Sequence, residues 1–206
     1  MNILILGATG RVGSRIAALA LQDGHHVTVL VRSPDKLDLV RGNVTIIEGN
    51  ALSKTDMQRA AAGNDAVISA LSTDGTTTLS ETTPLIVETM LQQNIRRIVT
   101  IGTAGILQSK TSPGMLRYQS GESNRKLTRA AEEHHRAFDV LLQSPLDWTI
   151  ICPTYLPDGP PLGAYRTERD FLPDGAAAIS VSDTAEFAYR QLTSVEYVKS
   201  RVGIAY

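Results

Sequence analysis

The stretch LILGATGRVGSRI, residues 4–16, decides the fold of this chain. Three glycines, Gly7, Gly10 and Gly13, follow directly after a short apolar run. Glycine costs conformational entropy at the start of a helix, so three of them at this point indicate a need for bare backbone. The apolar run predicts a strand, and the residues after the glycines recur at helical spacing. The stretch therefore predicts a strand, a glycine turn and a helix in close succession.

The rest of the chain continues this alternation of strands and helices. Strands are predicted over 2–6, 26–31, 44–48, 66–70, 97–101 and 149–152, and helices from the glycines to Gly24, then over 54–62 with Ser53 as its cap, 83–93 entered through Pro84, and 124–143. The strands are almost continuously apolar, which is typical of strands covered on both faces in a parallel sheet. We therefore predict an α/β fold, a doubly wound parallel sheet of the Rossmann type.

One domain is expected to span residues 1–206, because the length suits a single core. The loop LPDGPPLGAY, residues 156–165, is the one shift in composition. It opens a C-terminal part with weaker signals, in which we expect a helix over 182–193 and a last strand over 202–206. Residues 153–206 are predicted to form the substrate side of the molecule.

The glycine turn has the context that a dinucleotide pyrophosphate requires in such a sheet. Gly7 would allow the tight turn, Gly10 would let the backbone approach the phosphates, and Gly13 would let the helix pack closely on the sheet. Backbone N–H groups and the helix N-terminus supply positive potential. Thr9, Arg11 and Val12 belong to the same predicted cofactor site. The alternative is an ordinary glycine turn.

The end of the second strand indicates which dinucleotide is bound. An NAD site usually offers a carboxylate there for the ribose 2′-hydroxyl. This chain has Arg32 instead, with Ser33 and Lys36 nearby. A guanidinium group suits the 2′-phosphate of NADP, so we expect NADPH as the cofactor. The alternative is that Arg32 is a solvated surface charge.

Ligands of open α/β sheets bind outside the carboxyl ends of the strands. Residues at the other strand ends are therefore expected to line the same cleft. They are Gly49, Asn50 and Ala51 beside the adenine, Leu71, Ser72 and Thr73 beside the ribose, Gly102, Thr103 and Ala104 toward the nicotinamide, and Pro153, Thr154 and Tyr155 after the sixth strand.

Bulk properties exclude several classes of protein. The net charge of −1 gives no electrostatic case for binding nucleic acid or an anionic membrane. The single cysteine, Cys152, excludes an internal disulfide and is expected to be a buried thiol. No ligand-like spacing points to a metal site, and no run is long enough for a membrane span or a signal peptide. We expect a cytoplasmic protein, monomeric or a small homo-oligomer.

The motifs GATGRVG, VRSPDKL and LDWTIICP resemble the atypical short-chain dehydrogenase/reductases of the NAD(P)H-binding, NmrA-like type. Within that group, TIGTAGIL, the run from His134 to Trp148 and DGPPLGAYRT are most similar to the biliverdin reductase B, or flavin reductase (NADPH), branch. The resemblance implies an NADPH-dependent reductase that passes hydride to a flavin or another planar conjugated small molecule.

The resemblance also implies three residues for catalysis on the acceptor side. They are Thr103 after the fifth strand, His134 in the helix before the sixth strand, and Thr154 after the sixth strand. Thr154 stands where the branch has a second histidine, which weighs against biliverdin as substrate. Flavin reduction is less affected, because a reduced flavin can take its proton from solvent.

The Tyr-xxx-Lys pair of typical short-chain dehydrogenases is missing, since Tyr118 is followed four residues later by Glu122. Without the lysine, a tyrosine is a poor acid or base for alcohol–ketone exchange. His135 is interpreted as part of a polar helix face. The alternative function is an NmrA-like redox sensor that binds NADP(H) without turnover. Its partner contact would lie on residues 108–118 or in the C-terminal part.

Overall fold

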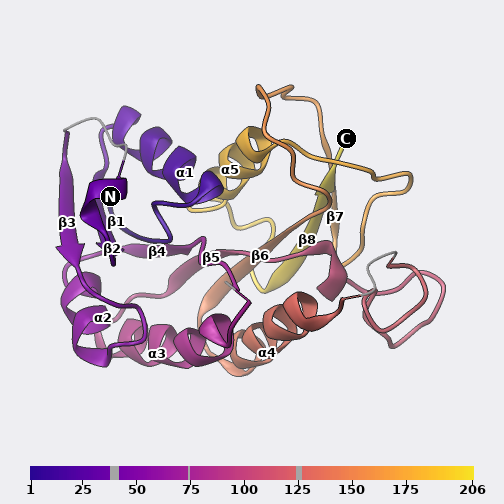
Figure 1. The fold of residues 1–206 in the computed structure, drawn as a ribbon, viewed down its shortest axis with the longest axis horizontal. Coiled ribbons are helices and arrows are strands. Elements are labelled where there is room, and N and C mark those ends of the chain that lie inside the picture. The colour runs from indigo at the N-terminus through magenta and orange to yellow at the C-terminus, as the bar shows by residue number, and fades with distance from the viewer. Residues whose placement is uncertain (38–41, 74, 124–126) are drawn as a thin grey trace.

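The computed structural model describes residues 1–37, 42–73, 75–123 and 127–206. These residues form one sheet of eight strands in the order β3-β2-β1-β4-β5-β6-β8-β7 (Figure 1). Neighbouring strands are parallel except for β7, which is antiparallel to β8. The strands are β1 Asn2–Leu6, β2 His26–Val31, β3 Val44–Glu48, β4 Ala66–Ser69, β5 Arg97–Ile101, β6 Asp147–Pro153, β7 Arg166–Arg169 and β8 Ser200–Ala205.

Helices cover both faces of the sheet, as the continuous apolar strands predict. The helices are α1 Arg11–Gln22, α2 Lys54–Ala61, α3 Thr78–Gln92, α4 Arg129–Gln143 and α5 Val181–Arg190, with short 3₁₀ turns η1 Pro34–Lys36 and η2 Ala104–Ile106. Figure 1 shows α1 and α5 on one face and α2, α3 and α4 on the other. Each face has its own apolar core, so the sheet is buried on both sides.

The strand order reverses beside β1, because β2 and β3 lie to one side of it and β4, β5 and β6 to the other. A reversal of this kind opens a crevice at the carboxyl ends of the strands, where doubly wound sheets bind ligands. The glycine turn after β1 lies at this point. The predicted doubly wound α/β fold is confirmed, with one antiparallel edge strand added.

The start of α3 differs from the prediction. The helix begins at Thr78 and places Pro84 in its interior, whereas the proline was expected near the first turn. The buried Glu133 of α4 accepts hydrogen bonds from the backbone N–H and the hydroxyl of Ser80, both at the first turn of α3. A carboxylate at this end of a helix satisfies unpaired N–H groups and favours the helix dipole. The earlier start thus depends on a contact between two helices.

Other boundaries shift by a few residues. Helix α4 begins at Arg129, after a non-helical Leu127 and Thr128, and the predicted first residues of that helix, 124–126, lie outside the described residues. Helix α5 begins at Val181 because the Ser180 hydroxyl accepts from the backbone N–H of Asp183. The predicted cap of α2, Ser53, is confirmed in the same way. Strand β7 was not predicted, because its sequence RTER has no apolar pattern.

The longest helices in the described part of the chain, α3 and α4, have 15 residues each. No helix in that part is long and apolar enough to cross a membrane.

Candidate functional site

The glycine turn after β1 is packed too tightly for a side chain at Gly7 or Gly13. Gly7 has φ +80°, and a Cβ atom on it would lie 2.5 Å from the carbonyl oxygen of Ala70. A Cβ atom on Gly13 would come within 3.0 Å of the Gly7 carbonyl group, closer than real Cβ atoms approach. A Cβ atom on Gly10 would lie 3.2 Å from the same oxygen. The turn and the first turn of α1 therefore form one compact unit with exposed backbone.

The N-terminus of α1 has neither a side-chain cap nor an acidic residue in its first turn. Its N-cap residue is Gly10, no side chain bonds to the first turn, and that turn contains no acidic residue. Unpaired N–H groups at a helix N-terminus, together with the helix dipole, attract an anion. The described geometry therefore fits a bound pyrophosphate, which would take the place of the missing cap.

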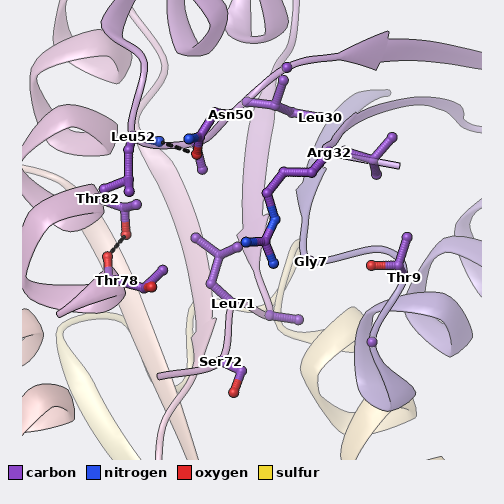
Figure 2. Close-up of a pocket in the computed structure, with 15 residues that line it drawn as sticks. Gly7, Thr9, Leu30, Arg32, Asn50, Leu52, Leu71, Ser72, Thr78 and Thr82 are labelled. Carbon is purple, nitrogen blue, oxygen red and sulfur yellow. Dashed lines mark hydrogen bonds between the residues drawn. The ribbon is translucent and has the colours of Figure 1, made fainter. Parts of the chain in front are cut away.

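A cavity of about 210 Å³ opens beside this turn (Figure 2). It is lined from the ends of β1, β2, β3 and β4 and from the start of α3. Of the predicted cofactor-binding residues, Gly7, Thr9, Gly10, Arg32, Asn50, Ala51, Leu71 and Ser72 line it. The predicted Gly49 lines it too. The structure adds Leu30, Val31, Leu52, Ala70, Thr78 and Thr82, of which the two threonines are new polar residues. We call this the first cavity.

Arg32 directs its guanidinium group into the first cavity, between Asn50, Leu71 and Gly7 (Figure 2). Its position follows from the fold, because it comes directly after β2, which pairs with β1. A guanidinium group in this position can donate two parallel hydrogen bonds to a phosphate. The predicted neighbours Ser33 and Lys36 are not part of the cavity wall. Ser33 directly precedes η1, and Lys36 is its last residue.

The loop after β3 is held by hydrogen bonds that shape the far wall of the first cavity. Asp56 of α2 accepts from the backbone N–H of Asn50 at 3.0 Å, and the Asn50 side chain accepts from the N–H of Leu52 at 3.1 Å. A hydrogen bond from the Asn50 backbone holds the pKa of Asp56 below its usual value. A Cβ atom on Gly49 would lie 2.7 Å from the Asp56 carboxyl carbon, so a side chain there would displace this carboxylate.

A second cavity of about 250 Å³ lies at the ends of β5 and β6. It contains the predicted residues Thr103, Pro153, Thr154 and Tyr155. The remaining wall comes from the segment between β5 and α4, the first turn of α4, and the chain before α5. These residues are Ala104, Gly105, Arg117, Tyr118, Glu122, Ser123, Leu127, Thr128, Ala130, Ala131, Leu172, Ala176 and Ala177.

Two threonine hydroxyls give the second cavity a polar side. The Thr103 hydroxyl accepts from the Gly105 N–H at 3.5 Å, which is a weak bond. The Thr154 Oγ1 atom is buried and has no hydrogen-bond partner within the described structure. A buried polar atom without a partner is costly, and a bound molecule can satisfy it.

The wall after β5 is organised by Glu122. Its carboxylate accepts from the Ser109 hydroxyl at 2.6 Å and the Thr111 N–H at 2.7 Å, and it pairs with Arg117 at 2.5 Å. The Ser109 hydrogen bond, followed by the bonds from Thr111 and the Arg117 charge, lowers the pKa of Glu122 to about 2 against the opposing effect of burial. This segment is therefore a structured wall of the cavity. Sequence inspection missed Arg117 and Tyr118 because their positions depend on this carboxylate.

Several predicted residues lie outside both cavities. The Arg11 guanidinium donates to the Leu156 carbonyl at 3.0 Å and approaches Asp158 at 3.5 Å, so it ties α1 to the loop after β6. Val12 is buried in the core and Gly13 packs against Gly7. Thr73 is described but lines neither cavity.

His134 occupies a different place from Thr103 and Thr154. It lines a small cavity of about 20 Å³ between the sheet and the helices α3 and α4, among side chains such as Leu79 and Phe138. Burial lowers the pKa of His134 to about 4, although the nearby Glu133 carboxylate acts in the opposite direction. The structure therefore does not bring His134 together with the two threonines.

The loop over residues 156–165 is fixed at both ends. The buried carboxylate of Asp183 accepts from the backbone N–H groups of Leu162 and Gly163 at 2.8 and 3.0 Å. It also accepts from Ser180 and Tyr206. Arg11 holds the other end of the loop through Leu156. The loop thus lies beside the glycine turn.

Comparisons with known proteins agree with this geometry. An uncharacterised Bacillus subtilis protein, YwnB, is 26% identical over 207 residues, covering 96% of this chain and 93% of its own length. A crystal structure of a Burkholderia pseudomallei protein, described as a candidate exported protein, superposes with TM-score 0.86 and 26% identity over 100% of both chains. A Streptococcus pneumoniae protein, described as a candidate NADH-flavin reductase, has TM-score 0.81 and 24% identity over 100% and 99% of the chains.

Two further curated relatives match only part of this chain, and the chain covers 25% and 24% of their lengths. A family of NAD(P)H-binding proteins matches residues 7–194, from the first glycine of the turn to the segment after α5. That match spans both cavities and the strand ends between them. The fold, the glycine turn and this match agree that the chain belongs to the NAD(P)H-binding family.

Proposed function

We propose that this protein is an NADPH-dependent reductase that transfers hydride to a flavin or a similar planar conjugated acceptor. The observation that carries the proposal is the arrangement of two cavities along one edge of the sheet. One includes the glycine turn and Arg32, and the other includes the threonines at the ends of β5 and β6. A dinucleotide in this family needs room for an adenosine half and a nicotinamide half across the switch point.

The first cavity would hold the adenosine half. The backbone of the glycine turn and the uncapped N-terminus of α1 would bind the pyrophosphate, and Asn50 and Leu71 would border the adenosine. Arg32 would bind the 2′-phosphate, which supports NADPH over NADH. When bound, the reduced nicotinamide supplies a hydride.

The second cavity would hold the reacting rings. Thr103 and Thr154 place hydroxyls at the ends of neighbouring strands, and the unpartnered Thr154 Oγ1 offers a donor or acceptor to a bound ring. Alanine and leucine side chains supply apolar surface for a planar molecule. The residues of this chain would then act by positioning two rings and excluding water. The relative described as an NADH-flavin reductase supports this acceptor class.

The first experiment is to measure the oxidation of NADPH by absorbance with FMN, riboflavin, biliverdin and a quinone, using NADH as the control. Turnover with NADPH and much less with NADH would support the proposal. Tight NADPH binding by calorimetry without turnover on any acceptor would contradict it and favour a redox sensor of the NmrA-like type. The cytoplasmic location and the monomeric or small homo-oligomeric state stay predictions, which cell fractionation and light scattering would test.

A further inference from the structure

The wall of the second cavity includes Tyr118, the tyrosine that lacks a lysine four residues later in the sequence. Tyr118 is half-buried in the wall, and its backbone N–H donates to the Gly105 carbonyl at 2.9 Å. A Cβ atom built on Gly105 would lie 3.5 Å from the Tyr118 Cβ and 3.7 Å from the Thr103 methyl. Tyr118 and Thr103 thus flank the same short turn at the end of β5.

The hydroxyl of Tyr118 is the first of a series of polar groups that runs from the cavity wall along α4. Its oxygen lies 2.9 Å from Nδ1 of His135 on α4, and Nε2 of the same imidazole lies 3.6 Å from the Asp139 carboxylate. The Gln119 amide donates to the Tyr118 oxygen at 3.3 Å. Asp139 is about half exposed, with 51% of its side chain accessible. These groups therefore run from a residue of the cavity wall to a half-exposed carboxylate.

The imidazole of His135 is held in place by its neighbours. Its ring stacks on Phe138 with centroids 6.5 Å apart, and Tyr118 meets it edge-on with centroids 5.7 Å apart. Phe138 is in turn fixed by Trp148 and by the Arg201 guanidinium above its ring. A neutral imidazole has one donor and one acceptor nitrogen. With Nε2–H facing Asp139, Nδ1 is left to accept from the Tyr118 hydroxyl.

We infer that Tyr118 delivers the proton to a carbonyl or quinone oxygen of the acceptor, and that His135 and Asp139 position it. The inference rests on the proposed function and concerns those planar acceptors, such as quinones, whose reduction needs a proton at oxygen. His135 occupies a place beside the phenol that the Tyr-xxx-Lys pattern would give to lysine. That relationship is invisible in the sequence because it joins the loop after β5 to the second turn of α4.

The acceptor carbon or ring gains the hydride of the reduced nicotinamide, and the acceptor oxygen gains the proton of the Tyr118 O–H bond, which breaks. The phenolate then takes a proton from solvent, so the Tyr118 O–H bond forms again. The imidazole of His135 stays neutral throughout, with Nδ1 as the acceptor beside the tyrosine oxygen. In this scheme a fixed donor within hydrogen-bond reach contributes about 10²- to 10⁴-fold in rate.

The experiment compares two acceptors that differ in their need for a proton. Menadione, a quinone, takes a hydride and a proton, whereas methylene blue, a cationic dye, becomes neutral by taking a hydride alone. Tyr118→Phe is expected to reduce kcat with menadione at least about tenfold and to leave methylene blue reduction within about twofold. His135→Gln is expected to reduce the menadione rate in the same direction. Tyr189→Phe is the matched control, because that hydroxyl donates to Asp23, the residue after α1, and Tyr189 lines neither cavity.

A second readout needs no turnover. Nitrogen-15 NMR of the unliganded protein is expected to show Nδ1 of His135 as a hydrogen-bonded acceptor, assigned by its loss in His135→Gln. In Tyr118→Phe this resonance should move toward that of an unbonded ring nitrogen, and in Tyr189→Phe it should not move.

The outcomes separate this inference from the proposed function. If wild-type protein reduces neither probe, the proposed function fails. If wild-type protein reduces both and Tyr118→Phe slows both equally or neither, the reductase stands and the role of Tyr118 is overturned. An Nδ1 resonance that is unchanged in Tyr118→Phe would also overturn it.

Discussion

Gly13 packs directly against Gly7: a Cβ atom on Gly13 would come within 3.0 Å of the Gly7 carbonyl oxygen. This contact sets how closely α1 approaches the end of β1, and therefore where the N–H groups of its first turn lie. The oxygen is backbone, so it cannot rotate away as a side chain would.

Gly13→Ala is expected to push α1 away from the turn. The cost of overpacking is about 1–3 kcal/mol in the free energy of unfolding, and NADPH affinity should fall as well because the phosphate-binding N–H groups shift. Urea unfolding and calorimetry would measure the two effects. Gly121→Ala is the matched control, since a Cβ atom there meets nothing within 4 Å. Equal effects in both variants would show that the contact with Gly7 determines neither the stability nor the NADPH affinity.

Asp183 is expected to be the main anchor of the 156–165 loop. Burial raises its pKa, but donors from Tyr206, Leu162, Gly163 and Ser180 outweigh this and hold the pKa below its usual value of 3.8. Asp183→Asn replaces one acceptor oxygen by a donor, which should cost about 1.5–3 kcal/mol in the free energy of unfolding at neutral pH.

The pH dependence of that difference follows from the direction of the pKa shift. The native carboxylate binds a proton less readily than the unfolded one, so its contribution is full above pH 3.8 and is lost as the pH falls through the native pKa. The gap between wild type and Asp183→Asn should therefore shrink in acid. Asp174→Asn, at a carboxylate that is 89% exposed, should show little change at either pH. A gap that is constant with pH would contradict the anchoring role.

The sequence predicts what local patterns control. The strands from β1 to β5 are encoded by contiguous apolar runs. The glycine turn is encoded by Gly7 and Gly13, where a Cβ atom would clash with backbone atoms. The start of α3 is not encoded locally, because Glu133 of α4 stabilises it across the helix pair. For this reason Thr78 was not predicted to line the first cavity.

Only the part of the second cavity that is encoded locally was predicted. Thr103 and Thr154 follow strands and could be located from the chain alone. Tyr118 lies in a segment without regular structure, whose path is set by the hydrogen bonds that Glu122 accepts. Only folded geometry reveals its contact with His135. His134 resembles a functional residue in sequence, but the rotation of α4 directs it toward α3 and the sheet.

His134 should make the protein less stable in acid. Burial lowers its pKa from 6.5 to about 4, so between these values the unfolded state binds more protons than the native state. Stability contributed by the neutral imidazole is full above pH 6.5 and falls as the pH drops toward 4. His134→Leu should flatten the dependence of the unfolding free energy over this range, measured by urea denaturation. An identical slope in wild type and His134→Leu would refute the burial effect.

Cys152 should be unreactive in the native protein. It is fully buried, and burial raises the pKa of its thiol to about 12, which leaves almost no thiolate at neutral pH. Since it is the single cysteine in the sequence, Ellman's reagent should report no thiol in native protein and one thiol in concentrated guanidinium chloride. Labelling of native protein at the rate of a free thiol would show that the region around β6 opens readily.

Arg32 should decide between NADPH and NADH. Its guanidinium group points into the first cavity beside Asn50 and Leu71, where a 2′-phosphate would lie (Figure 2). Arg32→Glu should weaken NADPH binding by about 1.5–3 kcal/mol, or about 10- to 150-fold, because a charge-assisted bidentate contact is lost. NADH binding should change much less, since it lacks the phosphate. Arg96→Glu is the matched control, as this exposed arginine precedes β5 at the amino end of the strands. Equal losses for both cofactors in Arg32→Glu would mean that the arginine contributes general positive potential and does not recognise the 2′-phosphate.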